Sequence, residues 1–458
     1  MSGRTLSRAR SGRPAAPVKT VHLGLGSFFR AHSAWYTERS GDDWGIAAFS
    51  GRTDTHVAEL RSQDCLYTLL QQGRHLEAEV ISAVVAAHPG NDLGAWRGYF
   101  ASPELQIVTS TITEAGYVRD SSGGLDLANE AVAADIAALK ADPEQAVVTT
   151  APSKLVAGLL ARRAAGAGPI TFVPCDNIVD SGALVRSVVQ TLAEQVDPSL
   201  LGWMSENVAY VTSMVDRITP RPTDADVAAV AELTGVADAA PVVTEPFSEW
   251  VLMGDFAGQR PAWEKAGATI VDDIVPFEHR KLWMLNGSHS LMAYAAPLLG
   301  CTTVGEAIAH PTVRDWVEQW WDVAGTHLPL PTDQVQAYRA ALVERFENPS
   351  IKHLLAQIAA DGSVKIPIRF VPVLQLELEQ GSLPEGATRP VAAWVAHLLG
   401  HGVPLNDAQA EEVSGLVGAD DAATVSAVCS WLGTASQPVV DQVLRQLAEL
   451  LELSRRAR

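Results

Sequence analysis

Short apolar runs fill the first part of the chain, and polar turns or amphipathic segments separate them. Runs of this kind, rich in Val, Ile and Leu and bounded by Gly, Pro, Asn or Asp, are typical of strands that are buried on both faces. The predicted strands cover residues 21–25, 44–50, 66–70, 79–85, 106–110, 170–174 and 209–214. Helical spacing at 127–139 and 154–165 separates two of these strands, which predicts a parallel sheet of the α/β class.

The pattern changes at about residues 273–278, where strand-like runs mostly stop. Beyond this point apolar residues recur at helical spacing. The predicted helices cover residues 304–309, 312–324, 333–346, 352–360, 391–399, 408–416, 422–432 and 439–453. The chain is therefore expected to carry an α/β domain over residues 19–275, followed by a mostly α-helical domain over residues 276–458.

A glycine turn follows the first predicted strand. Gly24-Leu25-Gly26 stands between that strand and a predicted helix that contains Trp35. A strand, a glycine turn and a helix form the phosphate-binding unit of a Rossmann-type dinucleotide-binding domain, where backbone N–H groups approach a pyrophosphate. Phe29 replaces the third glycine of the usual fingerprint, so the motif by itself is weak.

The residues after the second predicted strand bear on the choice of cofactor. Asp54 stands where a carboxylate would bind the ribose hydroxyls of NAD, whereas Arg52 would favour the 2′-phosphate of NADP. A solvated loop is the alternative interpretation of both residues. The choice between NAD and NADP therefore stays open.

Polar side chains follow three further predicted strands at their C-terminal ends, where open α/β sheets bind ligands. Glu114 could relay a proton or contact a substrate hydroxyl, and Asn177 could donate to an oxyanion. Asp216 is the third of these residues. The alternatives are a surface carboxylate for Glu114, an Asx turn for Asn177 and an ion pair between Asp216 and Arg217.

Lys281, Asn286 and His289 lie on a helix that is predicted to start after Pro276 and Glu278. On an α-helix these three side chains would fall within an arc of about 140°. A lysine, an amide and an imidazole that face one place can remove a proton, hold a developing oxyanion and orient a hydroxyl, as oxidation of an alcohol carbon requires. The alternative is an exposed lysine, a helix-interior asparagine and a core histidine.

Two cations lie in a second polar stretch, residues 361–369, which is predicted to be a turn because it contains glycine and proline. Lys365 and Arg369 flank Pro367 there. They could contact a polar or anionic substrate, and a solvated loop is the alternative.

Composition restricts the classes of partner and compartment. The 458 residues carry a formal charge of −19, so neither a nucleic acid duplex nor an anionic membrane is expected to bind the surface as a whole. The four cysteines are far apart in sequence, which excludes a CxxC pair and suits reduced thiols in the cytoplasm. No apolar run reaches the roughly 18 residues of a membrane span. Residues 1–18, which combine arginines with Ser, Gly and Pro, are expected to form a disordered basic tail.

Eight separated motifs complete the pattern. The most specific is Lys281-x4-Asn286-x2-His289. The others, in chain order, are Gly24-Leu-Gly-Ser-Phe-Phe-Arg-Ala-His32, Gln63-Asp-Cys-Leu-Tyr-Thr-Leu69, Thr113-Glu-Ala-Gly-Tyr117, Cys175-Asp-Asn177, Ser213-Met-Val-Asp-Arg-Ile-Thr-Pro220, Thr244-Glu-Pro-Phe247 and Asp361-Gly-Ser-Val-Lys-Ile-Pro-Ile-Arg369. Together they resemble the long-chain polyol dehydrogenases, the family of mannitol 2-dehydrogenase and fructuronate reductase.

This resemblance implies an oxidoreductase that uses NAD, with NADP as the alternative and no metal, and that interconverts a sugar alcohol and a ketose such as mannitol and fructose. It implies that Lys281 is the general base, that Asn177 and Asn286 hold the oxyanion, and that His289 orients the reacting oxygen. A lysine is ordinarily protonated at neutral pH, so this role requires surroundings that favour the neutral amine.

The resemblance also assigns the remaining candidates. Glu114, Asp216, Lys365 and Arg369 would contact substrate or relay protons, and the cofactor loop would include four residues: Gly24, Gly26, Phe28 and Arg30. Because of its two cations, the stretch at 361–369 resembles the uronate-reducing branch at least as well as the mannitol branch. Fructuronate reduction is therefore the alternative activity, and a non-catalytic NAD-binding regulator is a more distant one. The family's members are often monomers or dimers, so either a monomer or a homodimer is expected.

Overall fold

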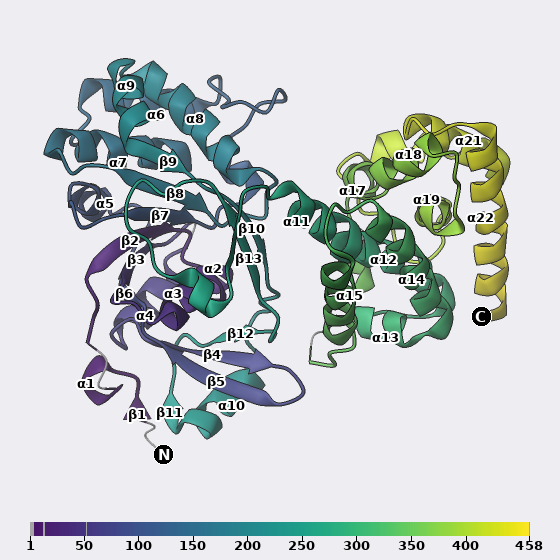
Figure 1. The fold of residues 1–458 in the computed structure, drawn as a ribbon, viewed down its shortest axis with the longest axis horizontal. Coiled ribbons are helices and arrows are strands. Elements are labelled where there is room, and N and C mark those ends of the chain that lie inside the picture. The colour runs from purple at the N-terminus through teal and green to yellow at the C-terminus, as the bar shows by residue number, and fades with distance from the viewer. Residues whose placement is uncertain (1–3, 12–13, 52, 351, 458) are drawn as a thin grey trace. The chain divides into compact units, whose positions relative to one another are not determined.

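A six-stranded parallel sheet organises the first part of the chain in this computed structural model (Figure 1). Its strand order is β6-β3-β2-β7-β8-β9, and every neighbouring pair is parallel. The strands are β2 (Val18–Leu23), β3 (Gly45–Phe49), β6 (Val84–His88), β7 (Ile107–Ser110), β8 (Ile170–Pro174) and β9 (Val208–Tyr210). This is the strand order of a doubly wound dinucleotide-binding fold, so the predicted Rossmann-type sheet is confirmed.

Helices cover both faces of this sheet, as continuous apolar strands require. Along β3, Ala47 and Phe49 belong to the core on one face, whereas Ile46 and Ala48 belong to the core on the other. The first face carries α5 (Leu93–Phe100), α6 (Glu130–Ala141), α7 (Ala151–Ala165), α8 (Ser181–Val196) and α9 (Ser199–Asn207). The second face carries α2 (Ser27–Ala31), α3 (Ser33–Ser40) and α4 (Thr55–Arg61).

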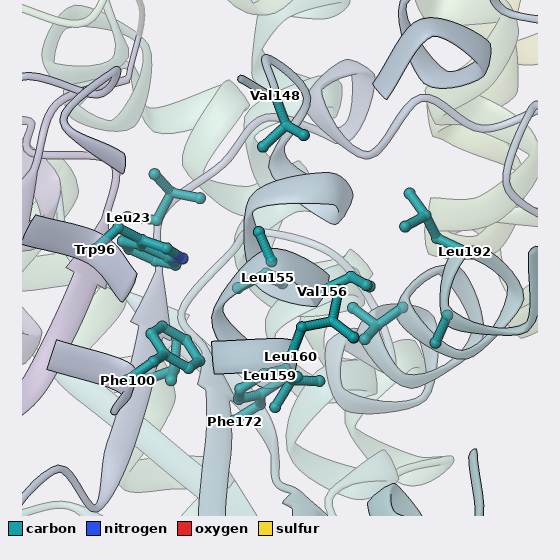
Figure 2. Packing of buried hydrophobic residues seen from close by; sticks show 14 of the residues in the cluster. Leu23, Trp96, Phe100, Val148, Leu155, Val156, Leu159, Leu160, Phe172 and Leu192 are labelled. Atoms are coloured by element: carbon teal, nitrogen blue, oxygen red, sulfur yellow. The ribbon is translucent and has the colours of Figure 1, made fainter. Parts of the chain in front are cut away.

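The core on the first face is built around α5 and α7 (Figure 2). Trp96 and Phe100 of α5 belong to one buried cluster with Leu155 and Leu159 of α7 and Phe172 of β8. Burial of such a side chain stabilises the fold by about 1.5–3 kcal/mol. This cluster therefore fixes the layer of helices against the sheet whose C-terminal edge carries the candidate site.

Three smaller sheets accompany the main one, with strand orders β12-β4-β5, β10-β13-β14 and β1-β11. Two predicted strands are split in the structure because the chain passes from one sheet into another. Residues 79–85 divide between β5 and β6, and residues 209–214 divide between β9 and β10. The additional strands are β4 (Tyr67–Gln72), β5 (Leu76–Ile81), β10 (Thr212–Asp216), β12 (Val242–Thr244), β13 (Glu249–Met253) and β14 (Thr269–Val271).

The structure describes residues 4–11, 14–51, 53–350 and 352–457, and its N-terminal segment differs from the predicted disordered tail. β1 (Arg4–Thr5) pairs in parallel with β11 (Val236–Ala237), and α1 (Arg8–Ser11) follows. The Arg8 guanidinium donates to the carbonyl oxygens of Ser82 and Val84, both at 2.8 Å. Arginine content alone favoured disorder, whereas these long-range hydrogen bonds hold the segment against the sheet.

Two compact units divide the chain, Met1–Ile274 and Val275–Arg458. The second unit is mostly helical, as predicted. Its elements include α11 (Val275–Arg280), a π-helix (Lys281–Gly287), α12 (Ser288–Ala295), α13 (Val304–Ala309), α14 (Pro311–Thr326), α15 (Thr332–Phe346), α16 (Leu355–Ile358), α17 (Gly362–Arg369), α18 (Val371–Glu379), α19 (Glu385–Leu398), α20 (Ala410–Ser414), α21 (Asp421–Trp431) and α22 (Gln437–Ala457).

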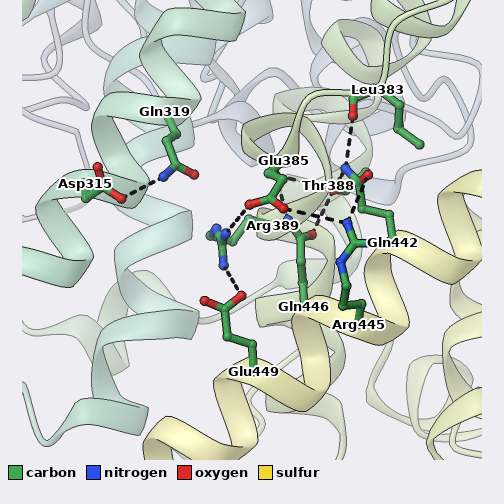
Figure 3. A network of polar contacts seen from close by, with 10 residues as sticks. All are labelled: Asp315, Gln319, Leu383, Glu385, Thr388, Arg389, Gln442, Arg445, Gln446 and Glu449. Atoms are coloured by element: carbon green, nitrogen blue, oxygen red, sulfur yellow. Dashed lines mark hydrogen bonds and ion pairs between the residues drawn. The ribbon is translucent and has the colours of Figure 1, made fainter.

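Helix α19 is buried along its length and is tied to α22 by a polar network (Figure 3). Arg389 of α19 donates to Glu385 and to Glu449 of α22, each at 3.1 Å. Thr388 donates to Gln446 at 2.8 Å. This burial overrides the proline inside α19, which at the sequence level placed the helix start at about residue 391. None of the helices in the described ranges combines the length and apolarity that a membrane crossing needs.

We expect Gly158→Ala to destabilise the first unit, because the added Cβ would lie 2.7 Å from ring atoms of the buried Phe100. Such overpacking costs about 1–3 kcal/mol and exceeds the gain in helix propensity of about 1 kcal/mol. The matched control is Gly98→Ala on α5, where an added Cβ meets nothing within 4 Å. Urea unfolding should show a loss of stability for Gly158→Ala and none for Gly98→Ala; equal stabilities would contradict the packing described here.

Candidate active site

The glycine turn after β2 makes a close approach to the end of β7. Gly24 has φ +113°, and an added Cβ would lie 2.3 Å from the carbonyl oxygen of Thr111. His22, fully buried in β2, contacts the Gly24 carbonyl oxygen at 3.2 Å and the Thr111 hydroxyl at 3.1 Å. Burial lowers the pKa of His22 to about 3, so this imidazole is neutral and its hydrogen bonds fix the turn.

The other residues predicted for the cofactor loop have different environments. Gly26 precedes α2, and Phe28 is partly buried and stacked on His32 with ring centroids 5.0 Å apart. Arg30 is only 1% exposed, and its guanidinium donates to the Gly26 carbonyl at 3.3 Å and the Ala240 carbonyl at 2.6 Å. Through these contacts Arg30 stabilises the turn.

Asp54 lies past the C-terminal end of β3, next in the sheet to β2. Its side chain is exposed and accepts a hydrogen bond from the Ser50 hydroxyl. The carboxylate is thus available at the position where such folds bind ribose hydroxyls. Arg52, the competing candidate, lies outside the described residues.

The tight glycine turn at Gly24 and the exposed carboxylate of Asp54 both fit a bound dinucleotide. A side chain at Gly24 would meet Thr111, so only glycine allows this turn. Lys154, in the first turns of α7, was not singled out from the sequence; desolvation lowers its pKa, and Asp135 and Asp54 act in the opposite direction. Because Lys154 is within electrostatic reach of Asp54, it lies at the same edge of the sheet. Its only sequence signal was a lysine near the start of a predicted helix.

Asp176 joins the two loops that carry Glu114 and Asn177. Its carboxylate accepts from the Ile112 N–H at 2.5 Å, the Ser110 hydroxyl at 3.0 Å and the Tyr117 hydroxyl. Glu114 itself is exposed and pairs with Arg119 at 3.1 Å, and Asn177 is exposed immediately after Asp176. Both loops carry motifs that were noted in the sequence, but Asp176, the buried carboxylate that connects them, was not among the predicted site residues.

Burial raises the pKa of Asp176 to about 6, against the opposing effect of its three hydrogen bonds. Desolvation and the neighbouring Asp176 raise the pKa of Tyr117 well above its ordinary value, so the phenol remains a donor. Asp216 ends β10 and is 6% exposed, so it is less accessible than Glu114. Its neighbour Arg217 donates to the carbonyl of Glu245 at 3.3 Å.

In the second unit, Lys281 and Asn286 lie on a π-helix that continues α11. The predicted helix start at this segment was wrong, because the helix begins at Val275. A π-helix has hydrogen bonds between residues five apart, so Lys281 and Asn286 lie on successive turns. On an α-helix the same spacing would separate them by about 140°. His289 follows on α12, three residues beyond Asn286.

His289 is partly buried against Phe346 and His353, with ring centroids at 5.0 Å and 5.2 Å. Desolvation lowers the pKa of His289 well below its ordinary value, and His353, Arg345 and Arg369 lower it further. The imidazole is therefore neutral at pH 7 and can accept or donate a hydrogen bond. His353 and Arg345 belong to no motif in the sequence, so they were not among the predicted site residues.

The two cations of residues 361–369 lie on helix α17, so the predicted turn was wrong. Ser363 N–H donates to Asp407 at 2.9 Å, and this distant carboxylate stabilises the first turn in spite of the glycine and proline. Lys365 donates to the carbonyls of Ile358 at 3.1 Å and Ala360 at 2.5 Å. Its pKa is lowered by desolvation and then by Arg369.

Arg369 contacts the helix that carries Lys281. Its Nη1 donates to the Asn286 carbonyl at 2.9 Å and to the Ser290 hydroxyl at 2.7 Å. Burial lowers the pKa of Arg369 to about 10, at which it stays charged at neutral pH. The structure thus brings Arg369 together with Asn286 and places it in electrostatic reach of His289. Within the described ranges, no group of three or more His, Cys, Asp or Glu side chains could hold a metal ion.

Comparison with known proteins covers both units. Residues 18–265 match the family model described as the mannitol dehydrogenase Rossmann domain, and residues 273–447 match the mannitol dehydrogenase C-terminal domain. D-mannonate oxidoreductase of Escherichia coli (strain K12) is 37% identical over 398 residues, which are 83% of this chain and 80% of that protein. D-arabinitol 4-dehydrogenase of Ralstonia nicotianae is 38% identical over 392 residues, 82% of each.

A solved structure is also similar. The mannitol 2-dehydrogenase of Pseudomonas fluorescens, in a ternary complex with NAD and D-mannitol, has a TM-score of 0.76 and 31% identity. The alignment covers 98% of this chain and 97% of that chain. These relatives act, by their names, on a sugar acid, a pentitol and a hexitol.

We expect the stability of the first unit to depend on pH through Asp176. Because the pKa of its carboxyl is raised to about 6 in the folded protein, the cost of the buried charge is present above pH 6. This cost falls as the pH drops below 6, because the folded protein then binds a proton that the unfolded chain, with its lower carboxyl pKa, does not yet bind. Compared with Asp176→Asn, which does not titrate, the wild type should gain about 1 kcal/mol in free energy of unfolding from pH 7 to pH 5.

Urea unfolding of both proteins at the two pH values measures this difference. Because all other titrating groups are shared, their effects cancel in the comparison. A constant difference would show that the pKa of Asp176 is not raised by folding, and a difference that moves against the wild type on acidification would show that it is lowered.

Proposed function

The chain belongs to the mannitol dehydrogenase family, and on that premise we propose that it is an NAD-dependent dehydrogenase that interconverts a sugar alcohol and its ketose, as mannitol and fructose. The observation that carries this proposal is the segment from Lys281 to His289. The π-helix at the start of this segment places Lys281 and Asn286 on successive turns, which suits a base and an amide that act on the same oxygen.

We assign each residue a role in alcohol oxidation. The amine of Lys281, in its neutral form, takes the proton of the substrate hydroxyl. The side-chain amides of Asn286 and Asn177 donate to the oxygen as negative charge develops on it. His289, neutral in its buried surroundings, accepts or donates the hydrogen bond that orients the hydroxyl. The nicotinamide cofactor, when bound, supplies the hydride acceptor.

The cofactor assignment rests on Asp54 and the glycine turn. An exposed carboxylate at the end of β3 suits the two free hydroxyls of the NAD ribose and would repel a 2′-phosphate. Gly24, Gly26 and Phe28 would form the turn that receives the pyrophosphate, braced from behind by Arg30. We therefore propose NAD as the preferred cofactor, with NADP as the competitor in the assay below.

Glu114 and Asp216 are proposed to relay protons or contact substrate hydroxyls. Glu114 is the more accessible of the two, with 72% of its side chain exposed, and its Arg119 partner is on the same loop. Arg369 and Lys365 already donate to backbone carbonyls within the second unit. Their remaining N–H groups are the ones proposed to reach a substrate.

Reduction of a hexuronate such as fructuronate is the second candidate activity. Arg345 and Arg369 both act electrostatically on His289. A carboxylate of a sugar acid would be attracted to these cations, and D-mannonate oxidoreductase is among the similar proteins. The same assay distinguishes this candidate from the polyol activity.

We expect Lys281→Ala to lose at least about a hundredfold in kcat with every active substrate, because the base contributes roughly 10²–10⁴. The control is Lys265→Ala, a lysine of the first unit with a mostly exposed side chain. Absorbance of the reduced nicotinamide measures turnover with ketoses, ketouronates, polyols and aldonates, each with NAD(H) and NADP(H).

Each outcome of this assay has a defined meaning. Turnover with one substrate class names the branch, and retention of full activity by Lys281→Ala would refute the proposed base. A wild type that binds NADH and turns over nothing in the panel would refute the proposed activity and favour a non-catalytic regulator.

A further inference from the structure

We infer that Trp320, Trp321 and Arg369 are positioning residues that hold residues 281–287 as a π-helix, and so keep Lys281 and Asn286 on successive turns. The inference rests on the proposed role of Lys281. It assigns a catalytic purpose to two buried tryptophans that no motif marks.

Three carbonyl groups of the π-helix accept hydrogen bonds from side chains outside it. The Trp320 indole N–H donates to the Trp283 carbonyl at 2.8 Å, and the Trp321 indole N–H donates to the Met284 carbonyl at 3.0 Å. The Arg369 Nη1 donates to the Asn286 carbonyl at 2.9 Å. The Ser288 hydroxyl of α12 also donates to the Met284 carbonyl, at 2.5 Å. The two indoles and the guanidinium come from α14 and α17, so two helices distant in sequence hold the π-helix.

These bonds are buried and the groups around them are closely packed. Trp320 is fully buried and Trp321 is 1% exposed. An added Cβ at Gly287 would lie 2.7 Å from the Trp320 indole nitrogen, so only glycine at this position allows the indole to reach the helix backbone. Trp320 also packs edge-on against Phe370, the residue after Arg369, with ring centroids 4.7 Å apart.

The need for outside donors follows from helix geometry. A π-helix is much rarer than an α-helix and occurs mostly as a short insertion, so a seven-residue run requires support from tertiary contacts. The hydrogen bonds to the carbonyls of Trp283, Met284 and Asn286 use the second lone pair of oxygens that already accept within the helix, and they add to the stability of the wider turn. Without them the segment would relax toward α-helix, and Lys281 would turn away from Asn286 by the larger α-helical angle.

The test replaces both tryptophans by phenylalanine, which keeps an aromatic ring and removes the indole N–H. The matched control is Trp394→Phe, because Trp394 is fully buried in the same unit and its indole nitrogen has no hydrogen-bond partner among the described residues. We expect W320F/W321F to lower kcat by about tenfold to a hundredfold, the loss typical of a base that is misplaced by about 1 Å. W394F should stay within about twofold of the wild type.

Two further readouts separate positioning from a general loss of structure. Hydrogen exchange followed by mass spectrometry should show faster exchange over residues 281–287 in W320F/W321F than in W394F. The pH profile of kcat should also shift in the double variant, because the base would ionise in altered surroundings, whereas the affinity for NADH should stay unchanged. Arg369→Lys, which keeps a donor, should retain more activity than Arg369→Met, which has none.

Equal kcat and equal exchange in W320F/W321F and W394F would overturn the inference. If the double variant fails to fold, the single variants W320F and W321F carry the same comparison. Failure of the proposed function is distinguishable, because then Lys281→Ala keeps its activity while the exchange of residues 281–287 still responds to the loss of the indole donors.

Discussion

The pairing of buried backbone carbonyls is the constraint on which this structure depends. Where the chain leaves regular α-helix or sheet, its carbonyl groups need donors, since a buried and unpaired polar group is costly. The π-helix at Lys281–Gly287 has backbone bonds between residues five apart, and two indoles, a guanidinium and the Ser288 hydroxyl donate to its carbonyls as well. The position of the proposed base thus depends on residues that lie far from it in sequence.

The first unit uses buried arginines in the same way. Arg162, fully buried in α7, donates to carbonyls of Phe100, Leu105 and Pro169, among others. Arg30 braces the glycine turn through the Gly26 carbonyl. A guanidinium has five N–H donors in a fixed plane, so one side chain can satisfy several loop carbonyls at once. Arg30 does this at the C-terminal edge of the sheet, where the cofactor is proposed to bind, and Arg162 does it at the opposite edge, just before β7 and β8 begin.

These long-range contacts mark the limit of what the sequence predicts. The alternation of strands and helices, the parallel sheet and the helical second unit follow from local hydrophobic patterns, and they are confirmed. The turn predicted at residues 361–369 is a helix, because Asp407 stabilises its first turn from a distant segment. Likewise, nothing in the spacing of Lys281 and Asn286 indicates a π-helix. The side chains that donate to its carbonyl groups, Trp320, Trp321 and Arg369, lie far from it in sequence.

The surroundings of His289 connect the two candidate activities. The net charge of −19 describes the chain as a whole, yet the pKa of this one imidazole is lowered by desolvation and then by His353, Arg345 and Arg369. A neutral imidazole can accept a hydrogen bond from a substrate hydroxyl, which an imidazolium cannot do. The same arginines would attract the carboxylate of a sugar acid. These surroundings of His289 are therefore compatible with both proposed activities.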